Sequence, residues 1–109
     1  MIIMKMYIAV LDTVPAHMVP VLVAHSVLSA HILMQDNHMY RTWLEVSFRK
    51  VVVKVNLKEL TKISNLPTMV HLGHENTTLE GAKCCAVVLP TYQEFIPNVL
   101  KFAKLWSPE

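Results

Sequence analysis

The chain has 109 residues, of which 53% are hydrophobic and 17% are charged. This length suits one domain with a substantial core and is too short for two, and the composition excludes an intrinsically disordered protein. The formal net charge of +2 is a weak signal, because duplex-binding proteins usually concentrate Lys and Arg far more strongly on one face.

Hydropathy along the chain gives no indication of a membrane protein. No stretch has the roughly 18 to 20 uninterrupted apolar residues that a membrane span needs. Residues 1–10 lack a basic region ahead of their apolar run, and Asp12 follows too soon for a signal peptide. We therefore expect a cytoplasmic protein without a membrane partner.

The first half of the chain predicts two strands separated by helices. Residues 3–11 have the aromatic and β-branched side chains typical of a strand. Apolar stripes at helical spacing predict a buried helix over about 17–34, with Pro20 in its first turn. A short helix over 40–48 leads into the valine-rich run 49–55. We interpret this run as the central strand, with cover on both faces.

The second half begins with a well-marked helix. Residues 57–64 carry an apolar stripe, Asn56 is a good N-cap, and Glu59 stands three positions later, where it completes a capping box. Strands are expected over residues 68–72 and 82–89. The order of elements so far is therefore strand, helix, strand, helix, strand, strand.

A last helix completes the expected fold. It opens with Thr91 as N-cap and Glu94 in a second capping box, and its regular part begins near Pro97. The resulting order, β-α-β-α-β-β-α, contains two strand-helix-strand crossovers, which are right-handed by rule. We expect residues 1–109 to form a single α/β domain with a mixed sheet of about four strands and helices on both faces.

The two cysteines are neighbours in the sequence. On a strand, Cys84 and Cys85 would point to opposite faces, so they are poorly placed to pair with each other or to ligate one metal. We expect both thiols to be reduced and buried. His71 and His74 are three apart, but no Cys or Asp completes a ligand set, so we expect no metal and no cofactor.

Two polar features are candidates for function. The segment 73–81 holds both glycines of the chain, and it is either a binding loop or a turn whose Asx and hydroxyl side chains bond nearby backbone. Basic residues concentrate between positions 41 and 62, where they form either one basic face or an ordinary solvated surface. These basic residues are Arg41, Arg49, Lys50, Lys54, Lys58 and Lys62.

Several stretches follow one another along nearly the whole chain. They are Met6-Tyr7-Ile8-Ala9-Val10, Ala24-His25-Ser26-Val27-Leu28-Ser29-Ala30, Trp43 ahead of Arg49-Lys50-Val51-Val52-Val53-Lys54-Val55, and Asn76-Thr77 ahead of Gly81 and residues 84–90. In these stretches the sequence resembles the type 2 peptidyl-tRNA hydrolases. The resemblance implies their α/β fold, a cytoplasmic location, frequent dimerisation, no metal cofactor, and hydrolysis of the ester that joins a peptide to tRNA.

The sequence departs from the family where the chemistry is expected. Anchored on His25, the family's second lysine falls on Met18 and its glutamine on Leu22. The family's Asp-Ala-Gly-x-Thr-Gln loop falls around residues 73–78, where an Asn and a Thr match but no aspartate is present. Ester hydrolysis needs a base or positioned donor for water and a cation or N–H pair for the oxyanion. These replacements argue against efficient hydrolysis.

The candidate site residues follow from this alignment. His25 is alternatively a structural residue whose ring bonds at the sheet edge. Two functions stay open: a hydrolase-like protein that binds the acceptor end of tRNA, or a noncatalytic protein-interaction module with the same fold. The candidate catalytic residues are His17, His74, Glu75, Asn76 and Thr77, and the candidate substrate-binding residues are His25, Thr78, Lys50, Lys54 and Lys58.

Overall fold

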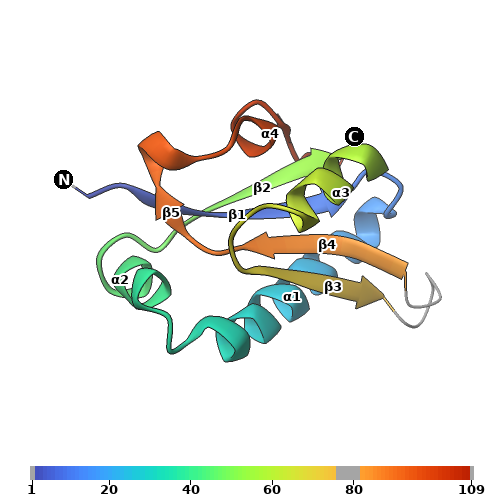
Figure 1. Ribbon diagram of the computed structural model, residues 1–109. Coiled ribbons are helices and arrows are strands. Elements are labelled where there is room, and N and C mark those ends of the chain that lie inside the picture. The colour runs from blue at the N-terminus through green and yellow to red at the C-terminus, as the bar shows by residue number, and fades with distance from the viewer. Residues whose placement is uncertain (1, 76–81, 109) are drawn as a thin grey trace.

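A computed structural model describes residues 2–75 and 82–108 (Figure 1). Helices and strands alternate in the first half, and short elements follow the last long strand. In chain order the elements are β1 (Met4–Leu11), the 3-10 turn η1 (Ala16–Met18), α1 (Val19–Met34), α2 (His38–Val46), β2 (Arg49–Val55), α3 (Leu57–Ser64), β3 (Val70–Glu75), β4 (Ala82–Val88), β5 (Thr91–Tyr92), the 3-10 turn η2 (Gln93–Phe95), α4 (Asn98–Lys101) and β6 (Lys104–Leu105).

The strands form one mixed sheet in the order β3-β4-β1-β2-β6, with β5 also paired to β1. β1 and β2 run parallel over their whole length, whereas β4 is antiparallel to both β1 and β3. Six strands take part, so the expected number of about four was too low. The two additional strands, β5 and β6, have two residues each and lack any hydropathy pattern of their own.

The valine-rich run does form β2, but it is not the central strand. β1 lies between β4 and β2, while β2 is followed only by the short strand β6. The first four residues of β2 are exposed or half-buried, and burial begins at Val53. The prediction of a central strand was therefore wrong, because a valine-rich pattern suits a strand near an edge as well. Cover on both faces is present only in the second part of the run, where Val52 packs toward α1 and Val53 and Val55 pack toward α3.

Alternate residues of β1 face two separate cores. Met6 and Ile8 pack with α1 and α2, whereas Tyr7 and Ala9 pack with α3 and α4. Figure 1 shows α1 and α2 on one side of the sheet and α3 on the other. The expectation of a single α/β domain with a mixed sheet and helices on both faces is confirmed.

The capping box predicted for α3 is present. Asn56 Oδ1 accepts a hydrogen bond from the Glu59 N–H at 2.8 Å, and Glu59 Oε1 accepts one from the Asn56 N–H at 2.9 Å. Leu60 and Ile63 then point into the core. This helix has the bounds that the sequence predicts.

The last predicted helix is largely absent from the structure. Thr91 is not an N-cap but pairs with Lys5 in β5, and the Gln93 N–H donates to the Ile3 carbonyl at 3.0 Å. Apart from the 3-10 turn η2, helical structure begins only at α4, which follows Pro97 and has four residues. Thr91 and Tyr92 therefore pair with the free edge of β1 and do not cap a helix, and Pro97 prevents a continuous helix.

Helix α1 is more exposed than its composition suggests. The segment Ala16–Met34 is long and apolar enough to cross a membrane by length and composition, a weak indication that core helices also give. Its inner stripe packs on the sheet, yet Val21, Leu28 and Ile32 are 72%, 65% and 66% exposed. The expectation of a buried helix was wrong for this outer face.

Candidate functional site

The predicted catalytic residues are only partly described by the structure. His17 lies in η1 and is exposed. His74 and Glu75 end β3, and their side chains lie outside the described part of the chain. Asn76 and Thr77, like the predicted substrate-binding Thr78, also lie outside the described residues. The loop that carries the resemblance therefore gives no geometry for a catalytic group.

The two positions that the resemblance assigns to a lysine and a glutamine are used for packing. Leu22 is 2% exposed and belongs to the core between α1 and the sheet. Met18 is half-buried and packs against the same core. His25 is exposed on α1 and makes no hydrogen bond to another described residue, so the bond expected at the sheet edge is not found.

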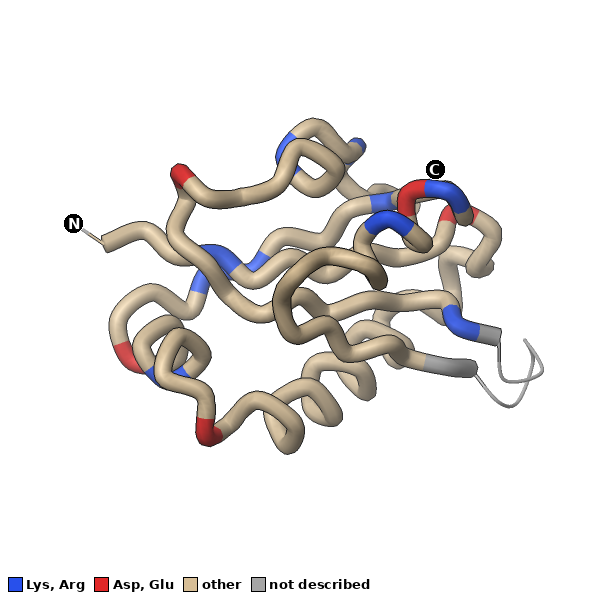
Figure 2. Tube along the Cα trace, viewed as in Figure 1, with Lys and Arg blue, Asp and Glu red and all other residues tan. Residues whose placement is uncertain are grey.

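The predicted basic residues do not gather on one face. Lys50 and Lys54 belong to β2, where Val52, the middle one of the three residues between them, packs toward α1. Lys58 belongs to α3, which packs on the opposite face of the sheet. Figure 2 shows Lys and Arg distributed over several elements. Of the two alternatives for the basic residues, the solvated surface agrees with this placement.

A groove of about 650 Å³ opens between α1, α2 and β2. Aliphatic side chains of α1 form one wall, aromatic side chains of α2 form the other, and β1 and β2 form the floor. The lining is nearly all apolar. It consists of Ile8, Val23, Ala24, Val27, Leu28, His31, Tyr40, Trp43, Leu44, Phe48, Lys50 and Val52.

The aromatic wall is held by hydrogen bonds at both ends. His31 Nδ1 and the Tyr40 hydroxyl lie 2.8 Å apart, and Trp43 Nε1 donates to the Arg49 carbonyl at 2.8 Å. The ring centroids of Tyr40 and Trp43 are 5.4 Å apart, and those of Trp43 and Phe48 are 5.3 Å apart. Burial raises the pKa of Tyr40, so its hydroxyl stays neutral at physiological pH. The wall is therefore well ordered before any ligand binds.

Lys50 stands at the mouth of the groove. Its ammonium donates to the Phe48 carbonyl at 2.7 Å and lies 3.2 Å from the centroid of the Phe48 ring. Phe48 has a φ of 62°, an uncommon conformation for a bulky residue, which turns the chain between α2 and β2. Partial burial lowers the pKa of Lys50. Lys50 is the single charged side chain among the described residues that line the groove.

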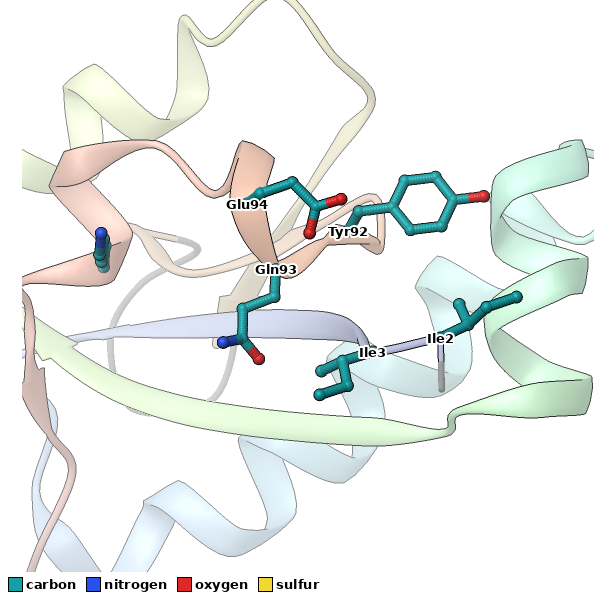
Figure 3. A pocket seen from close by; sticks show the side chains of 6 residues that line it. Ile2, Ile3, Tyr92, Gln93 and Glu94 are labelled. Atoms are coloured by element: carbon teal, nitrogen blue, oxygen red, sulfur yellow. The ribbon is translucent and has the colours of Figure 1, made fainter.

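A second hollow, of about 480 Å³, lies between the start of β1 and the β5–η2 segment. It is lined by polar and apolar side chains, including Glu94, Gln93 and Lys101. Figure 3 shows Glu94 beside Tyr92, while Gln93 extends from the other side of the ribbon toward Ile3. These polar groups do not converge on one point, so this hollow does not form an acid–base pair.

Two features of the sequence indicate the groove, although neither is a charge cluster or a motif. α1 has no Asp, Glu, Lys or Arg over its 16 residues, which predicts an exposed apolar surface if the helix packs by one stripe only. The spacing of Tyr40 and Trp43, three apart, places both rings on one face of α2. Their meeting with α1 is a tertiary arrangement that no local pattern specifies.

Two comparisons with known proteins found no match to this chain: no protein-family model matches it, and no curated protein does either. Among the described residues no group of three or more His, Cys, Asp or Glu side chains could hold a metal ion. The fold therefore defines the chain as a compact, single-domain α/β protein with an apolar groove.

Proposed function

We propose that this chain is a noncatalytic interaction module of the cytoplasm, with a fold like that of the type 2 peptidyl-tRNA hydrolases, and that it binds a protein partner through the outer face of α1. The observation that carries the proposal is this face: an exposed, uncharged helix surface on an otherwise well-packed domain. Large exposed apolar patches mark interaction sites in soluble proteins.

The spacing along α1 supports a second copy of the chain as the partner. Val21, His25, Leu28 and Ile32 are separated by four, three and four residues, which places them in one row opposite the buried stripe. Alternating steps of three and four are the pattern of a helix–helix seam. An uncharged row also packs against its own copy without like-charge repulsion. A homodimer would therefore bury this apolar row of α1.

The apolar replacements support the absence of catalysis. If Met18 and Leu22 occupy the family's lysine and glutamine positions, a cation and an amide donor are missing, each commonly worth about 100 to 1000 in rate. Leu22 is committed to the core, so it has no polar substitute at its own position. The described candidate His17 is exposed and has no described partner to orient it.

Binding to the acceptor end of tRNA is the second candidate function. Lys50, Lys54 and Lys58 would contact phosphates, but Lys58 comes from the element on the other face of the sheet. A few separated contacts predict weak binding, with a slope of log affinity against log salt of only about −1 to −2. Binding of this kind would not select tRNA over other nucleic acids.

The test combines association with activity. Sedimentation equilibrium should show a dimer that Leu28→Glu or Ile32→Lys converts to monomer. Leu33→Lys is the matched control, because Leu33 is exposed on α1 but lies off the row. Hydrolysis of labelled peptidyl-tRNA should stay near background, with a type 2 peptidyl-tRNA hydrolase as positive control.

Three results would count against the proposal. A monomer at all concentrations would remove the second copy as partner. Robust hydrolysis would restore the enzyme hypothesis, and alanine variants of His17, His74, Glu75, Asn76 and Thr77 would then identify the group responsible. Steep salt dependence of tRNA binding, lost in Lys50→Met, Lys54→Met and Lys58→Met, would favour the tRNA-binding alternative.

A further inference from the structure

The groove between α1 and α2 adjoins the outer face of α1 and shares Leu28 with it, but the two surfaces are otherwise lined by different residues. Val23 and Val27 project into it from the side of α1 that is turned toward α2, whereas Val21 and Ile32 do not line it. Its volume of about 650 Å³ lies within the range of small-molecule sites, roughly 300 to 1000 Å³. Such sites combine apolar walls with a few polar groups that fix the ligand's orientation.

The polar groups of this groove have a defined distribution. His31 Nδ1 and the Tyr40 hydroxyl bond each other, so these two polar atoms are already paired. Lys50 uses one of its three N–H donors on the Phe48 carbonyl, and the remaining donors are available at the mouth. No carboxylate lines the groove in the described part of the chain. The groove therefore has apolar walls and one positively charged group, the Lys50 ammonium, at one end.

We propose that this groove binds a free monoanionic amphiphile of the fatty-acid type, with its alkyl chain between α1 and α2 and its carboxylate on the Lys50 ammonium. The alkyl chain replaces water along Val27, Leu28 and Trp43. The carboxylate accepts charge-assisted hydrogen bonds from Lys50, which are stronger than neutral ones. A cation in place of the carboxylate would meet Lys50 and be rejected.

The ammonium is already in place for this role. The Phe48 carbonyl and the faces of the Phe48 and Trp43 rings, at 3.2 and 5.2 Å from Nζ, hold Lys50 over the mouth. The side-chain entropy that a flexible lysine would lose on binding is therefore partly lost beforehand. The same aromatic contacts leave the ammonium incompletely hydrated, which favours an anionic partner.

The test compares three ten-carbon probes that differ in the head group. Binding of decanoate, decanol and decyltrimethylammonium is measured by calorimetry with the wild type and with Lys50→Met, below the micelle concentrations of the two charged probes and below the solubility of decanol. Decanoate should bind at least ten-fold more tightly than decanol, and the ammonium probe should bind most weakly. Lys50→Met should abolish the preference for decanoate and leave decanol affinity unchanged within two-fold.

Matched variants separate charge from folding. Lys58→Met removes a lysine from the other face of the sheet and should leave all three affinities unchanged. Lys50→Arg keeps the charge and should restore the preference for decanoate. Ala24→Phe, which fills the groove, should weaken all three probes at least ten-fold while the thermal midpoint stays within a few degrees.

The proposal is overturned if decanoate and decyltrimethylammonium bind equally, if Lys50→Met and Lys58→Met have the same effect, or if no probe binds. It is also overturned if the protein prefers vesicles of phosphatidylcholine and phosphatidylglycerol to free decanoate, since a lipid surface would then be the ligand. Repeating the titration with Ile32→Lys keeps this inference separate from dimerisation. Decanoate should bind that variant as it binds the wild type.

Discussion

Gly73 of β3 lies where α1 packs on the sheet, and it is buried beside Ser26 and Cys85. A Cβ added at this position would overlap Ser26 Oγ and stand 3.2 Å from Ser26 Cβ and 3.4 Å from Cys85 Cβ. Ser26 is fully buried, and among the described residues its hydroxyl makes no well-formed hydrogen bond, only a weak interaction with the Cys85 thiol. The small residue at 73 therefore permits the close approach of helix and strand, and Ser26 makes that approach tight.

Gly73→Ala should destabilise the protein by about 1 to 3 kcal/mol, the usual cost of inserting a methyl group into a packed core. Ser26→Ala removes a poorly satisfied buried hydroxyl, and with it the atom that a Cβ at residue 73 would overlap, so it should be neutral or stabilising by up to about 1 kcal/mol. Urea unfolding of both variants and of the double variant measures the coupling. Strict additivity would show that the two residues do not contact each other.

Cys85 predicts a dependence of stability on pH. Burial raises the pKa of the Cys85 thiol from 9.0 to about 11; the Ser26 hydroxyl acts weakly in the opposite direction, and Cys84 adds to the rise. Because the folded state holds the proton more tightly, this stabilisation is complete below pH 9. It is lost as the pH rises from 9 to 11, by about 2 to 3 kcal/mol.

The measurement is the free energy of unfolding between pH 8 and pH 11 for the wild type and for Cys85→Ala. The variant lacks the titrating thiol, so its stability should fall less over this range, while the contributions of Lys and Tyr side chains are common to both proteins. Parallel curves would mean that the Cys85 thiol titrates alike in the folded and unfolded states.

At the scale of single elements, α3 illustrates a local signal that decides the structure. Asn56→Ala removes the side-chain acceptor of the capping box and should cost about 1 kcal/mol. Asn65→Ala is the control, because Asn65 follows the same helix and caps it through its backbone N–H only. In thermal unfolding, Asn56→Ala should have a lower midpoint temperature than the wild type, and Asn65→Ala should not. Equal midpoints for the two variants would contradict a stabilising role for the box.

The C-terminal segment illustrates the opposite case. Thr91 and Glu94 have the same spacing as Asn56 and Glu59, yet Thr91 pairs with β1. The helix at 57–64 could be predicted because its cap, its apolar stripe and its length agree. The segment after Thr91 lacks that agreement, since Pro97 interrupts it, and a tertiary hydrogen-bonding partner decides its structure. Likewise, the groove joins side chains from α1, α2 and β2 that no short-range pattern brings together.

At the scale of the whole molecule, the edge of the sheet at β2 is covered only by the short strand β6 and the residues that follow it. β6 pairs with β2 at Val53 and Lys54, the Trp106 N–H donates to the Val52 carbonyl at 3.0 Å, and Lys54 Nζ donates to the Ser107 carbonyl at 3.1 Å. Val53 is buried, whereas its partner Leu105 is 66% exposed. The segment thus covers the edge of β2 through backbone hydrogen bonds and through Trp106, which is half-buried and packs against the core, while Leu105 adds little.

Deleting residues 104–109 should therefore destabilise the domain by at least about 2 to 4 kcal/mol, since several hydrogen bonds worth about 1 kcal/mol each and the packing of Trp106 are lost. It should also leave unpaired N–H and C=O groups along β2, a template for pairing with another chain. Leu105→Lys, which keeps the backbone and changes only an exposed side chain, is the control and should behave as the wild type. Urea unfolding and light scattering measure the two effects. Because this association uses β2 and not α1, it should persist when Ile32→Lys is added to the truncated chain. A truncated protein that is as stable and as monodisperse as the Leu105→Lys control would show that β6 does not protect the sheet.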